Sequence, residues 1–134
     1  MKQIEELVNI TETLYLKEQA AVQEILSKEA TLRAKLAEID FQVQQARDNS
    51  ADMAPMQTIG GDVIWMAWVG RAKAQLNMQL AQVLARKSLV MGKVRQAFGK
   101  RLVAGQLAEA ETKAHLYKRR VRILASAYDN SGFK

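Results

Sequence analysis

Residues 2–48 contain neither glycine nor proline, and this feature constrains the fold of the chain most strongly. Apolar residues recur in this stretch at steps of three and four, the spacing of a helix that buries one face. These residues are Ile4, Leu7, Leu14, Ala21, Ile25, Leu32, Leu36, Ile39, Val43 and Ala46. The segment is therefore predicted to form one helix, about 70 Å long at 1.5 Å per residue.

The heptad pattern of this first helix is interrupted by polar residues. The positions that the repeat assigns to the apolar face include Thr11, Glu18 and Lys28. Two successive four-residue steps, from Lys28 to Leu32 and from Leu32 to Leu36, predict a stutter, which unwinds a supercoil locally.

A second long helix is expected after a turn at residues 49–58. Polar turn formers and Pro55 end the first helix, and either Thr58 or Asp62 is suited to cap the next one. The second helix is predicted over about 59–128, and residues 129–134 are predicted to be a disordered tail.

The second helix carries two apolar stripes. The first consists of Val69, Leu76, Leu80, Val83, Val90, Val94 and Ala97. After an expected phase break, with bending, near Phe98–Gly105, the second consists of Leu107, Ala110, Ala114, Tyr117, Val121, Leu124 and Tyr128.

The fold class predicted for residues 1–134 is all-α, with two long helices forming one antiparallel coiled-coil hairpin. A single heptad helix cannot bury its stripe alone, and a short connection folds two such helices back on each other. The first helix should pack against about residues 60–107, leaving about 108–128 as an overhang. The structural alternative is a three-helix bundle with a break at 99–105.

Charge is distributed unevenly along the chain. Residues 1–58 hold 6 basic and 10 acidic residues, whereas residues 59–134 hold 14 basic and 4 acidic residues. Pairing of oppositely charged helices accounts for part of this asymmetry. Within the first helix, favourable i,i+4 ion pairs are expected at Glu24–Lys28 and Glu29–Arg33.

The sequence contains no enzyme motif. The chain has no cysteine and a single histidine, His115, and it lacks phosphate loops, dinucleotide fingerprints and metal-binding histidine pairs. His115 lies four residues after Glu111, a spacing typical of a surface helix. We therefore expect no catalytic residues, metal, cofactor or small-molecule substrate.

Two segments are candidates for binding other proteins. Trp65 and Trp68, the only tryptophans, lie three residues apart near the expected hairpin tip, together with Phe41. They serve either as a plug that closes the tip or as interaction anchors. The second segment is a run of cations near the end of the second helix: Lys113, Lys118, Arg119, Arg120 and Arg122. It indicates an acidic partner, or else a solvated helix end.

This layout resembles the FliJ family of flagellar export proteins and the YscO-type stalk proteins of type III secretion. The resemblance lies in a first helix without glycine or proline, a short turn containing Pro55, an aromatic start to a longer helix, and a basic end. The closest local similarity is in residues 65–76, WMAWVGRAKAQL. The resemblance as a whole covers most of the chain.

The resemblance implies a stalk and escort protein of flagellum biogenesis and motility, located in the cytoplasm and associated peripherally with the inner-membrane export apparatus. It implies binding to the export gate's cytoplasmic domain through Phe41, Trp65, Trp68, Ala72 and Gln75. It also implies docking into the export ATPase ring, for which we single out the residues Lys113, Tyr117, Lys118, Arg119, Arg120, Arg122 and Leu124. Export chaperones are further expected partners.

Two other functions remain open from the sequence. One is a coiled-coil adaptor that associates with itself through its stripes. The other is a basic amphipathic helix that binds a membrane surface or nucleic acid. Nucleic acid is disfavoured because no aromatic platform or nucleic-acid motif accompanies the cations. The N-terminus lacks the apolar stretch of a secretory signal, and no apolar run approaches the ~20 residues of a membrane span.

Overall fold

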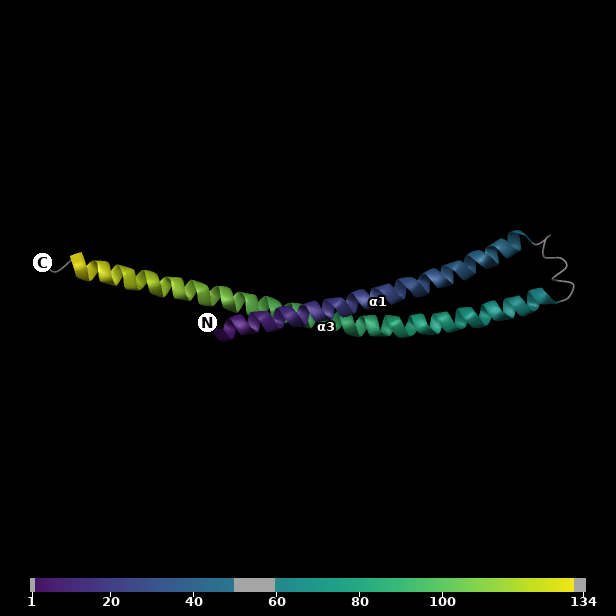
Figure 1. Ribbon diagram of the computed structural model, residues 1–134, viewed down its shortest axis with the longest axis horizontal. Coiled ribbons are helices and arrows are strands. Elements are labelled where there is room, and N and C mark those ends of the chain that lie inside the picture. The colour runs from purple at the N-terminus through teal and green to yellow at the C-terminus, as the bar shows by residue number, and fades with distance from the viewer. Residues whose placement is uncertain (1, 50–59, 132–134) are drawn as a thin grey trace. The chain divides into compact units, whose positions relative to one another are not determined.

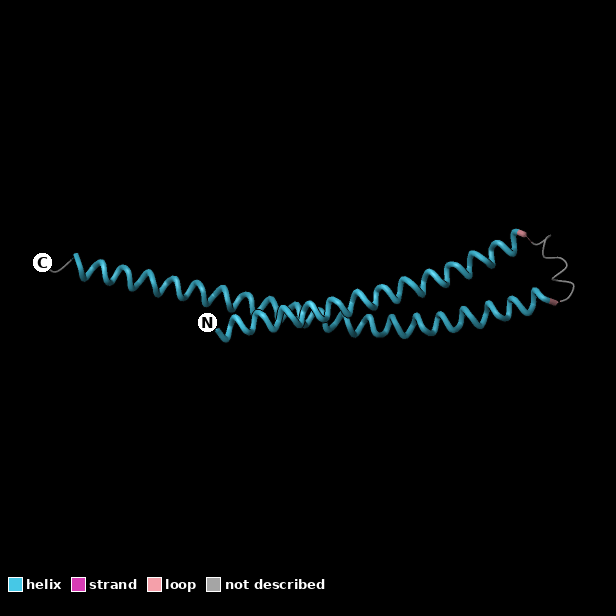
Figure 2. Tube along the Cα trace, viewed as in Figure 1, coloured by secondary structure: helices cyan, strands magenta, loops and turns pink. Residues whose placement is uncertain are grey.

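The structure, a computed structural model, consists of two long helices and describes residues 2–49 and 60–131. Helix α1 spans Lys2–Asp48 and helix α3 spans Gly61–Ser131 (Figure 1). They pack against each other as an antiparallel helical hairpin, as the sequence predicts. The secondary structure of the described residues is helical apart from short turns at the ends of α1 and α3 (Figure 2).

The bounds of α1 agree with the sequence prediction, whereas those of α3 differ. Helix α3 begins after Gly60, whose φ of 77° lies in the left-handed region that glycine adopts without strain. The Gly60 carbonyl accepts a bond from the Ile64 amide at 3.3 Å, and Asp62 lies in the first turn, where a carboxylate is favourable. Residues 50–59, with the proposed cap Thr58, are outside the described residues.

Helix α3 runs without interruption through residues 99–105 and continues to Ser131. The three-helix alternative, with its break at 99–105, is therefore wrong. The disordered tail is wrong for residues 129–131, which are helical; residues 132–134 are outside the described residues.

The described chain forms two units, each pairing a segment of α1 with a segment of α3. Within the described residues, unit 1 comprises residues 2–19 and 93–131, and unit 2 comprises residues 20–49 and 60–92. The pairing is antiparallel in each. In unit 2, Asp40 pairs with Lys73 and Glu29 pairs with Lys87. In unit 1, the Tyr15 and Phe98 rings lie 6.0 Å apart in a tilted arrangement.

The buried seam of α1 keeps an unbroken heptad spacing. Its buried or half-buried positions alternate steps of four and three: Ile4, Val8, Thr11, Tyr15, Glu18, Val22, Ile25, Glu29, Leu32, Leu36, Ile39, Val43 and Ala46. Glu29 occupies the position that we assigned to Lys28, so the predicted stutter is wrong. The Lys28 side chain is instead exposed and paired with Glu24 at 3.2 Å.

Two polar residues of the seam, Thr11 and Glu29, find hydrogen-bond partners. Thr11, only 6% exposed, donates its hydroxyl to the carbonyls of Leu7 and Val8 at 2.9 and 3.0 Å. Among the described residues, the buried apolar set is small, as expected for a two-helix core: Ile25, Leu32, Ile39, Val69, Ala97 and Ala104.

The seam of α3 continues in phase through the region where we predicted a phase break. Beyond Ala97 it passes through Arg101, Ala104, Ala108 and Glu111, each of which is buried or half-buried. Two of these four residues are charged, so an apolar pattern does not reveal them. The second stripe of the sequence, from Leu107 onward, therefore lies on another face of α3.

Among the described residues, neither helix contains a segment long and apolar enough to cross a membrane.

Candidate functional site

The end of α3 forms an arm without a helical partner. Residues 112–131, here called the arm, are all exposed. The N-terminal end of α1 reaches only its beginning, where Ile4 and Glu5 line a hollow with Thr112, His115 and Leu116. The predicted overhang is thus present but starts later than residue 108, because Ala108 and Glu111 still belong to the seam.

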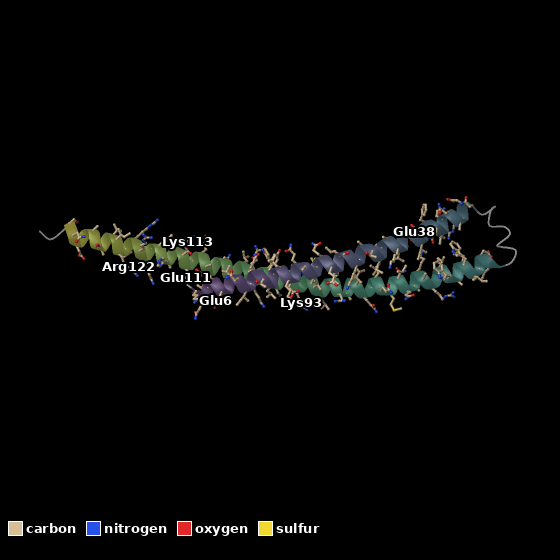
Figure 3. All side chains as sticks on the ribbon, in the orientation of Figure 1. Glu6, Glu38, Lys93, Glu111, Lys113 and Arg122 are labelled. Atoms are coloured by element: carbon tan, nitrogen blue, oxygen red, sulfur yellow. The ribbon has the colours of Figure 1, made fainter. Side chains whose placement is uncertain are left out.

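The arm carries the predicted cation run. All five cations, Lys113, Lys118, Arg119, Arg120 and Arg122, are exposed (Figure 3 labels Lys113 and Arg122). Lys113 pairs with Glu109 at 3.4 Å. Within the part of the chain that the structure describes, the other four cations make no ion pair. The charge of the arm is therefore available to an external partner.

The apolar side chains of the arm are also uncovered. Tyr117 is 70% exposed, Leu124 is 68% exposed and Tyr128 is 69% exposed, with Val121 between them at 47%. Large exposed side chains arranged at steps of three and four are the pattern by which an amphipathic helix binds a groove or another helix. The residues that we assigned to the ATPase therefore lie together on one accessible segment.

The aromatic candidates near the start of α3 divide by exposure. Trp68 is 50% exposed and Phe41 is 57% exposed, and Gln75 is also exposed, whereas Trp65 and Ala72 are half-buried. Trp65 lies one turn before the buried Val69 and shares its face. Trp65 thus contributes to packing, while Trp68 and Phe41 present rings to solvent.

The ion pairs between the helices lie where α1 packs against α3, before the arm begins. Among the described residues, three ion pairs join an acidic residue of α1 to a cation of α3: Asp40–Lys73 at 2.7 Å, Glu29–Lys87 at 3.0 Å, and Glu12–Arg101. The interpretation that oppositely charged helices pair is thus confirmed for these residues. The cations of the arm lie beyond this pairing.

Two polar clusters, one in each unit, were not predicted as pairing sites between the helices. In unit 2, the Glu29 side chain is 12% exposed and its pKa is lowered, chiefly by the hydrogen bond from Lys87 and then by that from Arg33. In unit 1, the Arg101 guanidinium lies 4.8 Å from the centre of the Tyr15 ring and pairs with Glu12. Charged residues at seam positions, here half-buried, favour one register of pairing.

The described residues contain no group of histidine and acidic side chains suited to hold a metal ion.

Comparison of the sequence and the fold with protein families, characterised proteins and solved structures finds no match.

Proposed function

We propose that this chain is a non-enzymatic stalk and escort protein of flagellar or type III protein export. It binds the export ATPase ring through the arm and the cytoplasmic domain of the export gate through the aromatic residues near the start of α3. The resemblance described above supplies the class of partner, and the hairpin with its arm is the arrangement that such a role requires.

The observation that carries the proposal is the fully exposed arm. It combines large exposed apolar side chains with four cations, Lys118, Arg119, Arg120 and Arg122, that make no ion pair within the described residues. A site on an ATPase with apolar walls and an acidic mouth would complement both features. The cations would speed association and make it dependent on salt, and apolar burial would contribute about 25 cal/mol per Å².

A second contact, with the export gate, is proposed for Phe41, Trp68 and Gln75. These side chains are exposed, and exposed aromatic rings are frequent anchors of protein interfaces. Trp65 and Ala72, which are half-buried and close to Trp68 in α3, would form the inner edge of this surface. Export chaperones are further proposed partners, and the proposed location is the cytoplasmic side of the export apparatus.

The test is a charge reversal on the arm. Changing both Arg119→Glu and Arg120→Glu should slow association with the purified export ATPase about tenfold, since charges at a rim act mainly on the association rate. Surface plasmon resonance at several salt concentrations measures it. The matched control, Arg71→Glu with Lys93→Glu, changes the net charge equally at exposed positions and should bind normally.

The proposed ATPase contact is wrong if both double variants bind the ATPase as the unmodified chain does. Binding of the unmodified chain to an oligonucleotide at physiological salt, but not to the ATPase, would favour the nucleic-acid alternative instead.

A further inference from the structure

Unit 1 contains a groove between α1 and α3. The groove is lined by Leu7 and Thr11 of α1 and by Gln96, Gly99, Lys100, Val103 and Ala104 of α3. Leu7 is 39% exposed and Val103 is 54% exposed. Ile10, one turn from Leu7 on α1, is 64% exposed. Two helices with apolar side chains facing outward along their junction provide a seat for a third helix.

The α3 wall of this groove belongs to a longer stripe that ends on the arm. Successive steps of three or four residues connect Gln96, Gly99, Val103, Leu107, Ala110, Ala114, Tyr117, Val121, Leu124 and Tyr128. Every one of these residues except Gly99, which is half-buried, is exposed. The stripe would therefore follow about 48 Å of α3.

This stripe is distinct from the seam that packs against α1. Val103, Leu107 and Ala110 each precede a seam residue by one position, which places the stripe about 100° from the seam around the helix. Continued past Glu111 at heptad spacing, the seam would meet His115, Lys118 and Arg122, which are polar. An extension of the hairpin would thus find no apolar surface, whereas a helix on the stripe would find one.

The charges beside the stripe determine what kind of helix fits. Lys113, Lys118, Arg120 and Arg122 adjoin its arm portion in sequence, and Lys100 lines the groove. Glu109 and Glu111 flank the stripe only before the arm begins, and Glu109 is paired with Lys113 at 3.4 Å. From residue 112 to residue 128, every charged side chain is a cation. A second copy using the same stripe would bring cations against cations, which is unfavourable.

We infer that unit 1 binds an amphipathic helix of another protein, with an apolar edge and acidic flanks, which lies in the groove between α1 and α3 and continues along the stripe of the arm. The inference shares the arm with the proposed function but adds the groove, the helical form of the partner and the sign of its flanking charge. It does not require the partner to be an export ATPase.

Gly99 allows this groove to be filled without disturbing the hairpin. A Cβ added at Gly99 would meet no atom within 4 Å, and the same holds at Gly105. Gly105, however, lines a different hollow of α3, with Phe98, Leu102 and Glu109. Both glycines lie inside α3, where a longer side chain favours the helix. Gly99→Met therefore blocks the groove, and Gly105→Met is its matched control.

The experiment uses the full chain and two designed helical peptides with the same leucine edge, one flanked by glutamate and the other by lysine. Fluorescence anisotropy at low salt should show binding of the glutamate peptide and at least about tenfold weaker binding of the lysine peptide. Gly99→Met should weaken binding of the glutamate peptide about tenfold or more, while Gly105→Met leaves it unchanged. Circular dichroism should show equal helicity in both variants.

Four binding outcomes would overturn the inference, and so would a fifth result from sedimentation. They are failure of the glutamate peptide to bind, equal binding of the two peptides, equal effects of the two glycine variants, and displacement of the peptide by phosphatidylserine vesicles, which would assign the stripe to a lipid surface. A dimer in sedimentation that the peptide dissociates would assign it to a second copy. Peptide binding at the groove without ATPase binding would remove the proposed function and leave this inference standing.

Discussion

Glu29 is the residue whose environment departs furthest from that of an ordinary surface carboxylate. It lies in the seam of α1, accepts hydrogen bonds from Lys87 at 3.0 Å and Arg33 at 3.2 Å, and has a lowered pKa. A group whose folded pKa is depressed stabilises the fold above its unfolded pKa, and that contribution is lost as pH falls through the folded pKa. Glu29 therefore stabilises the hairpin at neutral pH but not in strong acid.

Replacing Glu29 by Gln should lower the melting temperature at pH 7. The difference in melting temperature from the unmodified chain should shrink as pH falls below the ordinary carboxyl pKa of 4.5. Protonation of Glu29 then removes its stabilising contribution from the unmodified chain as well. Circular dichroism melts between neutral and acidic pH measure this. Glu38→Gln, at an exposed position, is the control. A deficit that is independent of pH would contradict the role assigned to the ionised carboxylate.

The two tryptophans should differ in what they stabilise. Trp65→Ala should lower the melting temperature more than Trp68→Ala, since Trp65 is half-buried and Trp68 is 50% exposed. Binding to the gate domain should respond in the opposite order, with Trp68→Ala causing the larger loss. Thermal melts measure the effect on stability, and isothermal titration calorimetry measures the effect on binding to the gate domain. A larger loss of stability from Trp68→Ala would indicate that Trp68 is the tip plug.

At the scale of the elements, α3 is continuous, but its internal glycines lower its stability. A Cβ at Gly70 or Gly105 would meet nothing within 4 Å, and both positions are exposed. Gly70→Ala and Gly105→Ala should each stabilise the chain by about 0.5–1 kcal/mol, because alanine loses less backbone entropy in a helix. Urea unfolding followed by circular dichroism measures the change. A decrease in stability would mean that the glycine conformation is required.

The sequence predicts the two helices well because local features decide them. The absence of glycine and proline in residues 2–48, followed by Pro55, is sufficient to place α1 and its end. The seam was harder to predict. Glu29 and Arg101 lie in it with their charges paired to residues of the other helix or of the same one, and a search for apolar residues passes over such positions.

The sequence identifies the residues of the candidate sites, but it does not show which face of α3 they occupy relative to α1. The cation run and the stripe from Leu107 to Tyr128 are visible in the sequence, yet the sequence does not show that the stripe faces away from α1. That depends on the phase of the seam at Ala104 and Ala108, which the pairing with α1 determines. The groove beside Gly99 follows from the same phase and was not predicted.

At the scale of the whole molecule, stability and binding should be separable by truncation. Residues 117–131 are exposed and extend past the part of α3 that contacts Ile4 and Glu5. They contribute helix but no interhelical packing, so ending the chain after Leu116 should leave the free energy of unfolding nearly unchanged. Ending it after Lys100 should destabilise unit 1, because Ala104, 1% exposed, and the Arg101–Glu12 pair are then lost.

The same pair of truncations distinguishes the arm as a binding element from the arm as a folding element. The chain ending at Leu116 should melt like the full chain but fail to bind the acidic peptide and the export ATPase, since Tyr117, Val121 and Leu124 supply their apolar contact. Denaturant unfolding measures the stability of the truncated chain, and fluorescence anisotropy measures its binding of the acidic peptide. If this chain melts well below the full chain, residues 117–131 stabilise the hairpin itself, and their exposure does not mark a surface reserved for a partner.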